Sequence, residues 1–303
     1  MKPERSGIPL TADIVFKYVF GNRGSETILR SLLSAVQTDA GYPAVAEVSI
    51  ENPFNLQEFT DAKLSVVDVK ALDVTGAVFT IEVQAEREPA FLKRALYYWA
   101  AAYYRQLTAA DPYGYLQRTV GVNILDYVVF PDRPRMHTAF VLSALDDPAL
   151  VMSDDLLIHT IELPKLSIPS TGLERWGYYL SRRGSENAME DPILLRTLRD
   201  DPEIQNAEER YRQFMADPQL ESRYRARQRF LHQQATNLEE ARNEGLQRGR
   251  EEGREEGREE GRREQLRETA RKMKAAGIEA AVIESVTGLT IDELEKPPKA
   301  DRR

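Results

Sequence analysis

Two acidic residues, Asp68 and Glu82, stand in a pattern that suits metal-dependent hydrolysis. Each lies in a segment that alternates apolar and polar residues, 64–72 and 77–84, and a short turn separates the segments. A three-residue loop ending at Gly76 would place the two acids opposite each other, with their Cβ atoms about 4.5–5.5 Å apart. Like charges in such a pair are destabilising unless a cation lies between them. A divalent cation with oxygen ligands fits that place.

Gln84 extends the pattern, because residues two positions apart on a strand share a face. An aspartate followed on the next strand by an acid-x-basic triplet can hold Mg²⁺ against a phosphate, where the ion activates the attacking water. Here Asp68 and the triplet Glu82-Val83-Gln84 supply that order. The spacing of Asp68, Glu82 and Gln84 therefore indicates cleavage of phosphodiester bonds. A solvated outer face of a hairpin is the alternative, since acids, lysines and threonines are ordinary there. The hairpin by itself leaves both interpretations open.

Hydrophobic periodicity predicts the elements that position these residues. The patterns indicate helices over 13–20, 25–38 and 91–107, strands near 45–52, 118–129, 137–142 and 156–163, and a helical region over 172–234. This order predicts an α/β fold with helices packed on a mixed central sheet.

Specific packing roles follow from the same patterns. Ser25 is predicted to cap the second helix. The helix over 91–107 carries an apolar stripe that we expect to be core, and the helical region from 172 carries further packing residues. The stripe consists of Leu92, Leu96, Trp99 and Tyr103, and the further packing residues are Trp176, Tyr179, Leu180, Ile193 and Leu194.

Composition narrows the classes of function. The chain has 303 residues, a net charge of −8 and no cysteine, so thiolate metal sites and cysteine nucleophiles are excluded. Its three histidines are far apart in the sequence, at positions 137, 159 and 232, and we expect each to be structural or on the surface. The sequence shows neither a signal peptide nor a run of about 18 apolar residues. We therefore expect a cytoplasmic protein without a membrane partner.

The last seventy residues differ in character from the rest. Glycines recur every fourth position from Gly245 to Gly261 within an Arg-Glu-Glu repeat, and each costs a helix about 1 kcal/mol relative to alanine. The repeat is either a solvated linker or an oligomerising stalk. Short helical patterns follow, and Thr290 with Glu293 fits a capping box. We expect a core at 1–170, a helical subdomain at 171–237, the repeat at 238–268 and a small helical module at 269–303.

Taken together, these motifs resemble the recombination-promoting nuclease and transposase family of the PD-(D/E)XK superfamily. The resemblance spans roughly 12–163 and resumes in the tail. It rests on Asp13-Ile-Val-Phe-Lys-Tyr-Val-Phe-Gly21, Lys63-Leu-Ser-Val-Val-Asp-Val-Lys70, Ile81-Glu-Val-Gln84, Arg94-Ala-Leu-Tyr-Tyr98 and the glycine-periodic tail. It implies a restriction-endonuclease-like fold with a helical C-terminal extension, DNA as the substrate, and Mg²⁺ as cofactor with Mn²⁺ as a substitute.

The resemblance also assigns roles to the acids. Asp68 and Glu82 become the metal ligands, and Asp13 becomes an additional acid, with an N-terminal helix cap as its alternative role. Gln84 stands where the superfamily usually has lysine. Glutamine cannot bring positive charge to the phosphate, but it can orient the attacking water.

Three basic residues are candidates for contact with phosphate: Lys17, Lys70 and Arg94. A cross-strand ion pair with Glu82 is the alternative for Lys70, and solvation on a helix surface is the alternative for the other two. The main functional interpretation is a DNA endonuclease with a role in recombination or mobile elements, assembled as a homo-oligomer through the repeat. Two alternatives are a catalytically silent nuclease-fold protein that assembles through its tail, and a DNA-binding regulator that uses the C-terminal helices.

Overall fold

The computed structural model describes residues 7–54, 69–290 and 293 of the chain. Its contacts define two compact units, Met1–Arg225 and Ala226–Arg303. The finer division into four parts stays a prediction. The elements of the first unit are α1 (Asp13–Phe20), α2 (Glu26–Asp39), β1 (Val48–Ile50), β2 (Val69–Asp73), β3 (Val78–Gln84), α4 (Phe91–Tyr104), β4 (Thr119–Leu125), β5 (His137–Phe140), β6 (Leu156–Glu162), α5 (Gly172–Arg182), α6 (Pro192–Asp200) and α7 (Pro202–Ala216).

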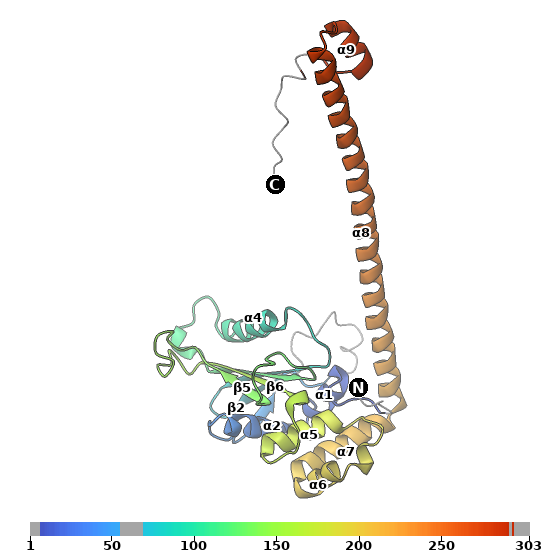
Figure 1. The fold of residues 1–303 in the computed structure, drawn as a ribbon. Coiled ribbons are helices and arrows are strands. Elements are labelled where there is room, and N and C mark those ends of the chain that lie inside the picture. Colours follow the sequence, from blue (N-terminus) through green and yellow to red (C-terminus); the bar gives the residue numbers. More distant parts are fainter. Residues whose placement is uncertain (1–6, 55–68, 291–292, 294–303) are drawn as a thin grey trace. The chain divides into compact units, whose positions relative to one another are not determined.

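Six strands form one mixed sheet in the order β1-β2-β3-β4-β6-β5. The central strands β3, β4 and β6 run parallel, whereas β1, β2 and β5 join them by antiparallel pairing. Figure 1 shows α4 on one side of the sheet and α1, α2 and α5 on the other. Both faces of a parallel sheet are normally covered, and every residue of β4 is accordingly buried. The predicted restriction-endonuclease-like architecture, a mixed central sheet flanked by helices, is confirmed.

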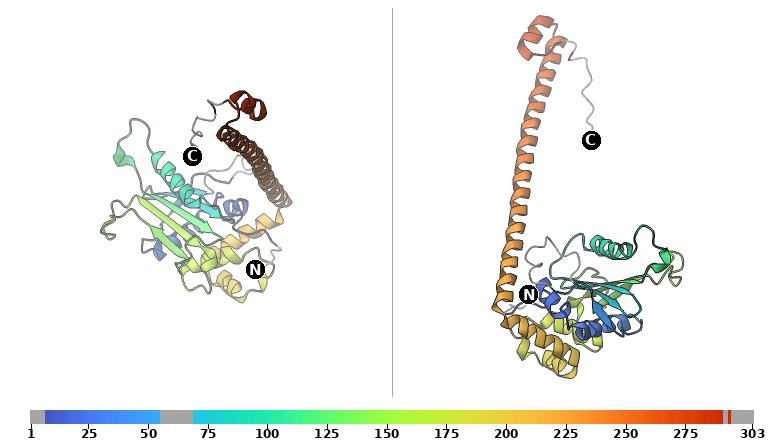
Figure 2. Two further views of the ribbon diagram at one scale, coloured as in Figure 1. Left: turned by 45° about the horizontal axis from the view of Figure 1, so that its top comes forward. Right: turned by 180° about the vertical axis from the view of Figure 1, so that it is seen from behind.

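The main core lies between the sheet and the helices α1, α2, α5 and α7. Its aromatic centre includes Phe20, whose ring lies 5.6 Å from that of Trp176. Figure 2 shows α6 and α7, drawn in yellow and orange, on the same side of the sheet as α1 and α2. Of the predicted packing residues in this region, Ile193 is partly buried and the rest are buried, namely Trp176, Tyr179, Leu180 and Leu194.

Some element ends differ from the prediction. Ser25 precedes α2 as expected, but its side chain makes no capping hydrogen bond. Its backbone has φ −98° and ψ 8°, whereas a capping residue normally has an extended backbone. The predicted strand over 118–129 ends at Leu125, because Leu125 pairs with Gln84 and Glu162, the last residues of the two neighbouring strands. Further on, the backbone N–H groups of Val129 and Phe130 donate to the carboxylate of Glu162.

The prediction that the apolar stripe of α4 is core was wrong for half of its members. Leu92 and Leu96 are exposed, Trp99 and Tyr103 are half-buried, and Phe91 is the buried residue of this helix. The reason is that α4 contacts β3 and β4 along one side while its other side faces away from the sheet (Figure 1). Periodicity identifies which residues share a helix face, but it does not show what covers that face.

Two of the three histidines meet in the core. His137 Nε2 and His159 Nδ1 are 2.9 Å apart, because β5 and β6 are neighbours in the sheet. His137 Nδ1 lies 2.7 Å from Asp39 Oδ2, and His159 Nε2 lies 3.3 Å from Gln37 Nε2. These four side chains form a hydrogen-bonded chain that ties α2 to the sheet. The third histidine, His232, is exposed.

The helices of the C-terminal region are α8 (Pro218–Ala275) and α9 (Ala280–Thr287). The glycine repeat lies within α8 and is helical throughout, which favours a stalk over an irregular linker. A Cβ atom added at any glycine from Gly245 to Gly261 would meet nothing within 4 Å. A small apolar cluster joins the end of α8 to α9 through Ala270 and Ile283.

The predicted capping box after α9 is confirmed. Thr290 N donates to Glu293 Oε2 over 3.0 Å, and Glu293 N donates to Thr290 Oγ1 over 3.4 Å. Among the described residues, none of the helices combines the length and the apolar content that a membrane span requires.

Candidate functional site

The predicted hairpin is present in the predicted register. Lys70 pairs with Thr80 across β2 and β3, and Asp73 N donates to Ala77 O over 3.1 Å. Gly76 has φ +88°, the left-handed conformation that the last residue of such a loop requires and glycine adopts readily. The turn therefore fixes which residues of β2 and β3 face each other.

Asp68 lies outside the described residues, so its pairing with Glu82 stays a prediction. The register next to it is described: Val69, the following residue, pairs with Ile81. Because pairing advances one residue on each strand, this register is the one that the predicted pair of acids requires.

Glu82 lies in a buried polar row on the sheet face that α4 covers. It pairs with Asn123 on β4, Asn123 pairs with Thr160 on β6, and Thr160 pairs with Thr138 on β5. Glu82 is only 6% exposed, and its neighbour on the same face, Thr80, is also buried. The alternative of a solvated hairpin face is thus wrong at these positions. A buried carboxylate needs a compensating charge.

Arg94 on α4 supplies a positive charge to Glu82. Its Nη2 lies 3.5 Å from Glu82 Oε2, and its Nη1 forms an ion pair with Glu88. The guanidinium carbon lies 5.8 Å from the centre of the Tyr98 ring. Burial, and then the carboxylate of Glu82, raise the pKa of the Tyr98 hydroxyl. Arg94 therefore faces the predicted site and not the outer surface of its helix.

Gln84 is the last residue of β3, two residues beyond Glu82 on the same face, and is half-buried. Its backbone carbonyl accepts a hydrogen bond of 2.9 Å from the N–H of Asp126, the first residue after β4. Sequence reasoning missed Asp126, which is 9% exposed. Its position directly after a buried strand was the available signal, but only the pairing of β3 with β4 places it beside Gln84.

The other predicted residues lie on α1 and β2. Asp13 is the first residue of α1, and Ala12 occupies the capping position, so the alternative role of Asp13 as helix cap was wrong. Its Oδ1 accepts a hydrogen bond of 2.8 Å from Ile14 N. Lys17 is half-buried on the same helix, and Lys70 is exposed on β2. The catalytic and phosphate-binding roles of these residues stay predictions.

Oxygen donors dominate the site. In the described part of the chain, no three histidine or acidic residues lie close enough together to hold a metal ion. Glu82 and Gln84 share one face of β3, and Asp126 follows the adjoining strand. Carboxylate and amide oxygens are the ligands that suit Mg²⁺. The chemistry of these donors fits that ion, and the predicted further ligand, Asp68, lies outside the described residues.

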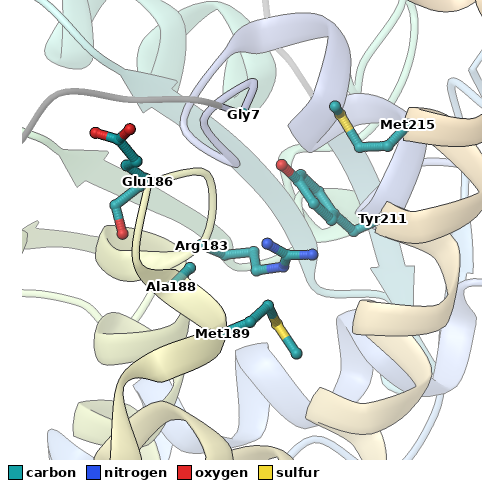
Figure 3. A pocket seen from close by; sticks show the side chains of 8 residues that line it. Gly7, Arg183, Glu186, Ala188, Met189, Tyr211 and Met215 are labelled. Atoms are coloured by element: carbon teal, nitrogen blue, oxygen red, sulfur yellow. The ribbon is translucent and has the colours of Figure 1, made fainter.

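A separate pocket of about 250 Å³ lies near the N-terminal segment (Figure 3). Arg183 points into it, but its guanidinium donates to both oxygens of Glu208, over 2.7 and 3.0 Å, and lies 4.3 Å from the centre of the Tyr211 ring. These contacts give Arg183 a structural role. The lining residues are Gly7, Arg183, Ser185, Glu186, Ala188, Met189, Tyr211 and Met215.

One of the comparisons with known proteins identifies a family, and that family agrees with the observed fold. Residues 10–241 match a family model described as PD-(D/E)XK nuclease family transposase. This range covers the sheet, its flanking helices and the first part of α8. Comparison with curated proteins and with solved structures gives no match.

Proposed function

The chain belongs to the PD-(D/E)XK nuclease family of transposases, and from that premise we propose that it is a metal-dependent DNA endonuclease. The observation that supports this most strongly is the buried Glu82 on β3, in the register that would set it opposite Asp68. Burial of an ion pair such as Glu82 with Arg94 can cost more free energy than the attraction returns, and such buried charges gather at functional sites. In a nuclease family, the function of such a charge is to bind a cation.

In this proposal Asp68 and Glu82 hold Mg²⁺, or Mn²⁺ in its place. The bound ion lowers the pKa of the attacking water and offsets charge on the leaving oxygen. Gln84 shares the face of Glu82 and orients the water through its amide group, while Asp13 is an additional acid. Gln84 lacks the positive charge of a lysine, and Arg94, already beside Glu82, is placed to offer that charge to the phosphate.

DNA binding in this proposal depends mainly on phosphate contacts, to which Lys17 and Lys70 contribute. Cleavage should therefore weaken steeply as salt is added, because bound cations are released when basic side chains contact phosphates. We further propose that the protein acts in the cytoplasm in recombination or mobile-element chemistry, and that it self-associates through the glycine repeat of α8.

The test is cleavage of supercoiled plasmid by the full chain in Mg²⁺. Wild type should nick or linearise the plasmid, and EDTA, Asp68→Ala or Glu82→Gln should abolish the cutting. Glu209→Gln is the matched control, since it removes the charge of an exposed glutamate on α7 and should leave cutting unchanged. Circular dichroism of each variant shows that it is folded.

Absence of cutting by folded wild type in both Mg²⁺ and Mn²⁺ would refute the proposal. The silent assembly protein would then be the better interpretation, and Gln84 is the residue that supports it, since it replaces the usual lysine.

A further inference from the structure

The outer face of α4 carries aromatic side chains that the fold does not bury. Tyr97 is 65% exposed and Tyr104 is 82% exposed. Lys93, Tyr97, Ala100 and Tyr104 are spaced by four, three and four residues, so they follow one stripe of the helix, and all four are exposed. Lys93, Tyr97, Tyr104 and the adjacent exposed Arg105 are called the outer tyrosine face here.

On the inner side of the same helix, the aromatic side chains have hydrogen-bond partners. Trp99 Nε1 donates to Thr119 O over 2.8 Å, and the Tyr103 hydroxyl donates to Asp155 Oδ2 over 2.9 Å. These side chains fasten α4 to the sheet. Hydrogen bonding thus explains the inner Tyr103. Of the outer two tyrosines, Tyr97 contacts the Tyr98 ring, with the ring centres 5.7 Å apart, and both Tyr97 and Tyr104 keep most of their surface in solvent.

Charge on α4 is entirely positive in a protein of net charge −8. The sequence contains no acidic residue between Glu88 and Asp111, whereas Lys93, Arg94 and Arg105 lie in that interval. A helix surface whose own charged residues are all basic is complementary to a polyanion. Lys93 and Arg105 are twelve residues apart, so a helix rise of 1.5 Å per residue separates them by about 18 Å along the axis, a length that spans several phosphates of one strand.

We propose that the outer tyrosine face binds an unpaired segment of the DNA substrate, with bases stacked on Tyr97 and Tyr104 and phosphates on Lys93 and Arg105. This inference rests on the proposed function and specifies its substrate. Stacking on aromatic rings requires open base faces, which a single strand offers and an intact duplex does not. A purely electrostatic contact with duplex DNA would need the basic residues but not the tyrosines.

The position of this face agrees with the proposed chemistry. Arg94, on the inner side of the first turn of α4, contacts Glu82, and a helix with its side chains is only about 10–12 Å across. A strand held on the outer side therefore lies within a few nucleotides of Glu82. The bound segment would be continuous with the phosphate that is cut.

The test measures binding to a fluorescein-labelled oligothymidylate of about 16 nucleotides, the upper site size of single-strand binding folds, by the full chain in EDTA, which prevents cleavage. Tyr97→Ala and Tyr104→Ala should each weaken binding about fivefold or more, the fold-change that corresponds to stacking of roughly 1 kcal/mol. Tyr97→Phe and Tyr104→Phe should bind like wild type, because the ring is kept. Phe230→Ala is the matched control, as Phe230 is a 60% exposed aromatic residue on α8.

Other outcomes overturn the inference. Unchanged affinity for the oligothymidylate in the double alanine variant, with plasmid nicking by wild type intact, refutes the inference and leaves the endonuclease standing. An equal loss for a duplex of the same length indicates contact without stacking. A change of sedimentation coefficient without a change in DNA affinity would show that the face binds a second copy of the chain. Failure of wild type to nick plasmid refutes the proposed function itself.

Discussion

Glu208 shows how a single buried charge is held in the core of this protein. Its carboxylate accepts hydrogen bonds from Arg183, at 2.7 and 3.0 Å, and from Arg212, at 2.7 Å. The glutamate side chain is 4% exposed and that of Arg183 is 14% exposed. In such a pair each ion compensates for the lost hydration of the other.

Glu208→Gln should therefore lower the free energy of unfolding by about 3 kcal/mol, because it leaves the buried Arg183 without its counterion. Asp200→Asn is the control, since Asp200 pairs with Arg196 at an exposed position, where an ion pair contributes little to stability. Urea unfolding followed by circular dichroism measures both changes. Equal losses for the two variants would contradict this account.

His159 should make stability depend on pH. Burial, and then the neighbouring His137, lower the pKa of His159 from 6.5 to about 3, and burial also lowers the pKa of His137. Between these values the unfolded chain binds a proton that the folded chain does not, so stability falls as the pH is lowered below 6.5. For His159 the loss approaches about 1.4 kcal/mol per pH unit between these two pKa values.

Unfolding in urea at pH 6.5, 5.5 and 4.5 measures this effect. His159→Gln should reduce the slope of stability against pH, while His232→Gln, at an exposed position of α8, should retain the slope of wild type. The comparison between the two variants removes the contribution of the carboxyl groups, which both proteins share. An identical slope in all three proteins would show that His159 does not contribute.

At the scale of elements, local sequence patterns predicted most of the helices and strands of the fold. The bounds of α1, the buried run of β4 and the turn at Gly76 all follow from spacing and from backbone preferences within a few residues. The contact of His137 with His159 could not be predicted in this way, because it depends on β6 lying between β4 and β5 in the sheet. The same limit applies to Asp126, which reaches Gln84 only through strand pairing.

Helix caps illustrate the same limit, since residue type alone does not show whether the side chain before a helix makes a capping hydrogen bond. Thr171 before α5 forms a complete capping box with Glu174, whereas Ser25 before α2 makes no capping hydrogen bond. The difference lies in the backbone: Thr171 is extended, with φ −104° and ψ 170°, and Ser25 is not.

Thr171→Ala should consequently lower the free energy of unfolding by about 1 kcal/mol. Thr171→Ser should retain most of the stability that the cap contributes. Ser25→Ala should cost less than Thr171→Ala, because there is no capping hydrogen bond to lose and the buried Ser25 hydroxyl has no hydrogen-bond partner in the described part of the chain. Thermal denaturation of the three variants provides the comparison. A larger loss at Ser25 than at Thr171 would refute it.

At the scale of the whole molecule, the main core draws on the first unit. Among the described residues, the members of the main hydrophobic cluster and the side chains packed against it all lie between Ile8 and Tyr224. The second unit has its own small cluster around Ala270 and Ile283. The stability of the first unit should thus be independent of the glycine repeat.

A chain that ends at Asn243 should accordingly keep the thermal midpoint of the core and the plasmid-nicking activity, and it should lose self-association. Calorimetry, the plasmid assay and sedimentation velocity test the three parts. Retained cutting with lost assembly supports a stalk in the repeat. Loss of DNA binding on truncation would instead assign DNA recognition to the C-terminal helices.

The hydrogen-bonded chain from Gln37 to Asp39 has a direction. An amide nitrogen only donates, so His159 Nε2 accepts from Gln37 Nε2, and His159 Nδ1 carries the hydrogen that it donates to His137 Nε2. His137 Nδ1 then donates to the carboxylate of Asp39. Both rings are thereby fixed as the same tautomer, and neither can change it alone. An added proton on either ring would set two N–H donors against each other, so the pair accepts a proton only when a neighbouring group, such as the Gln37 amide, turns to present an acceptor.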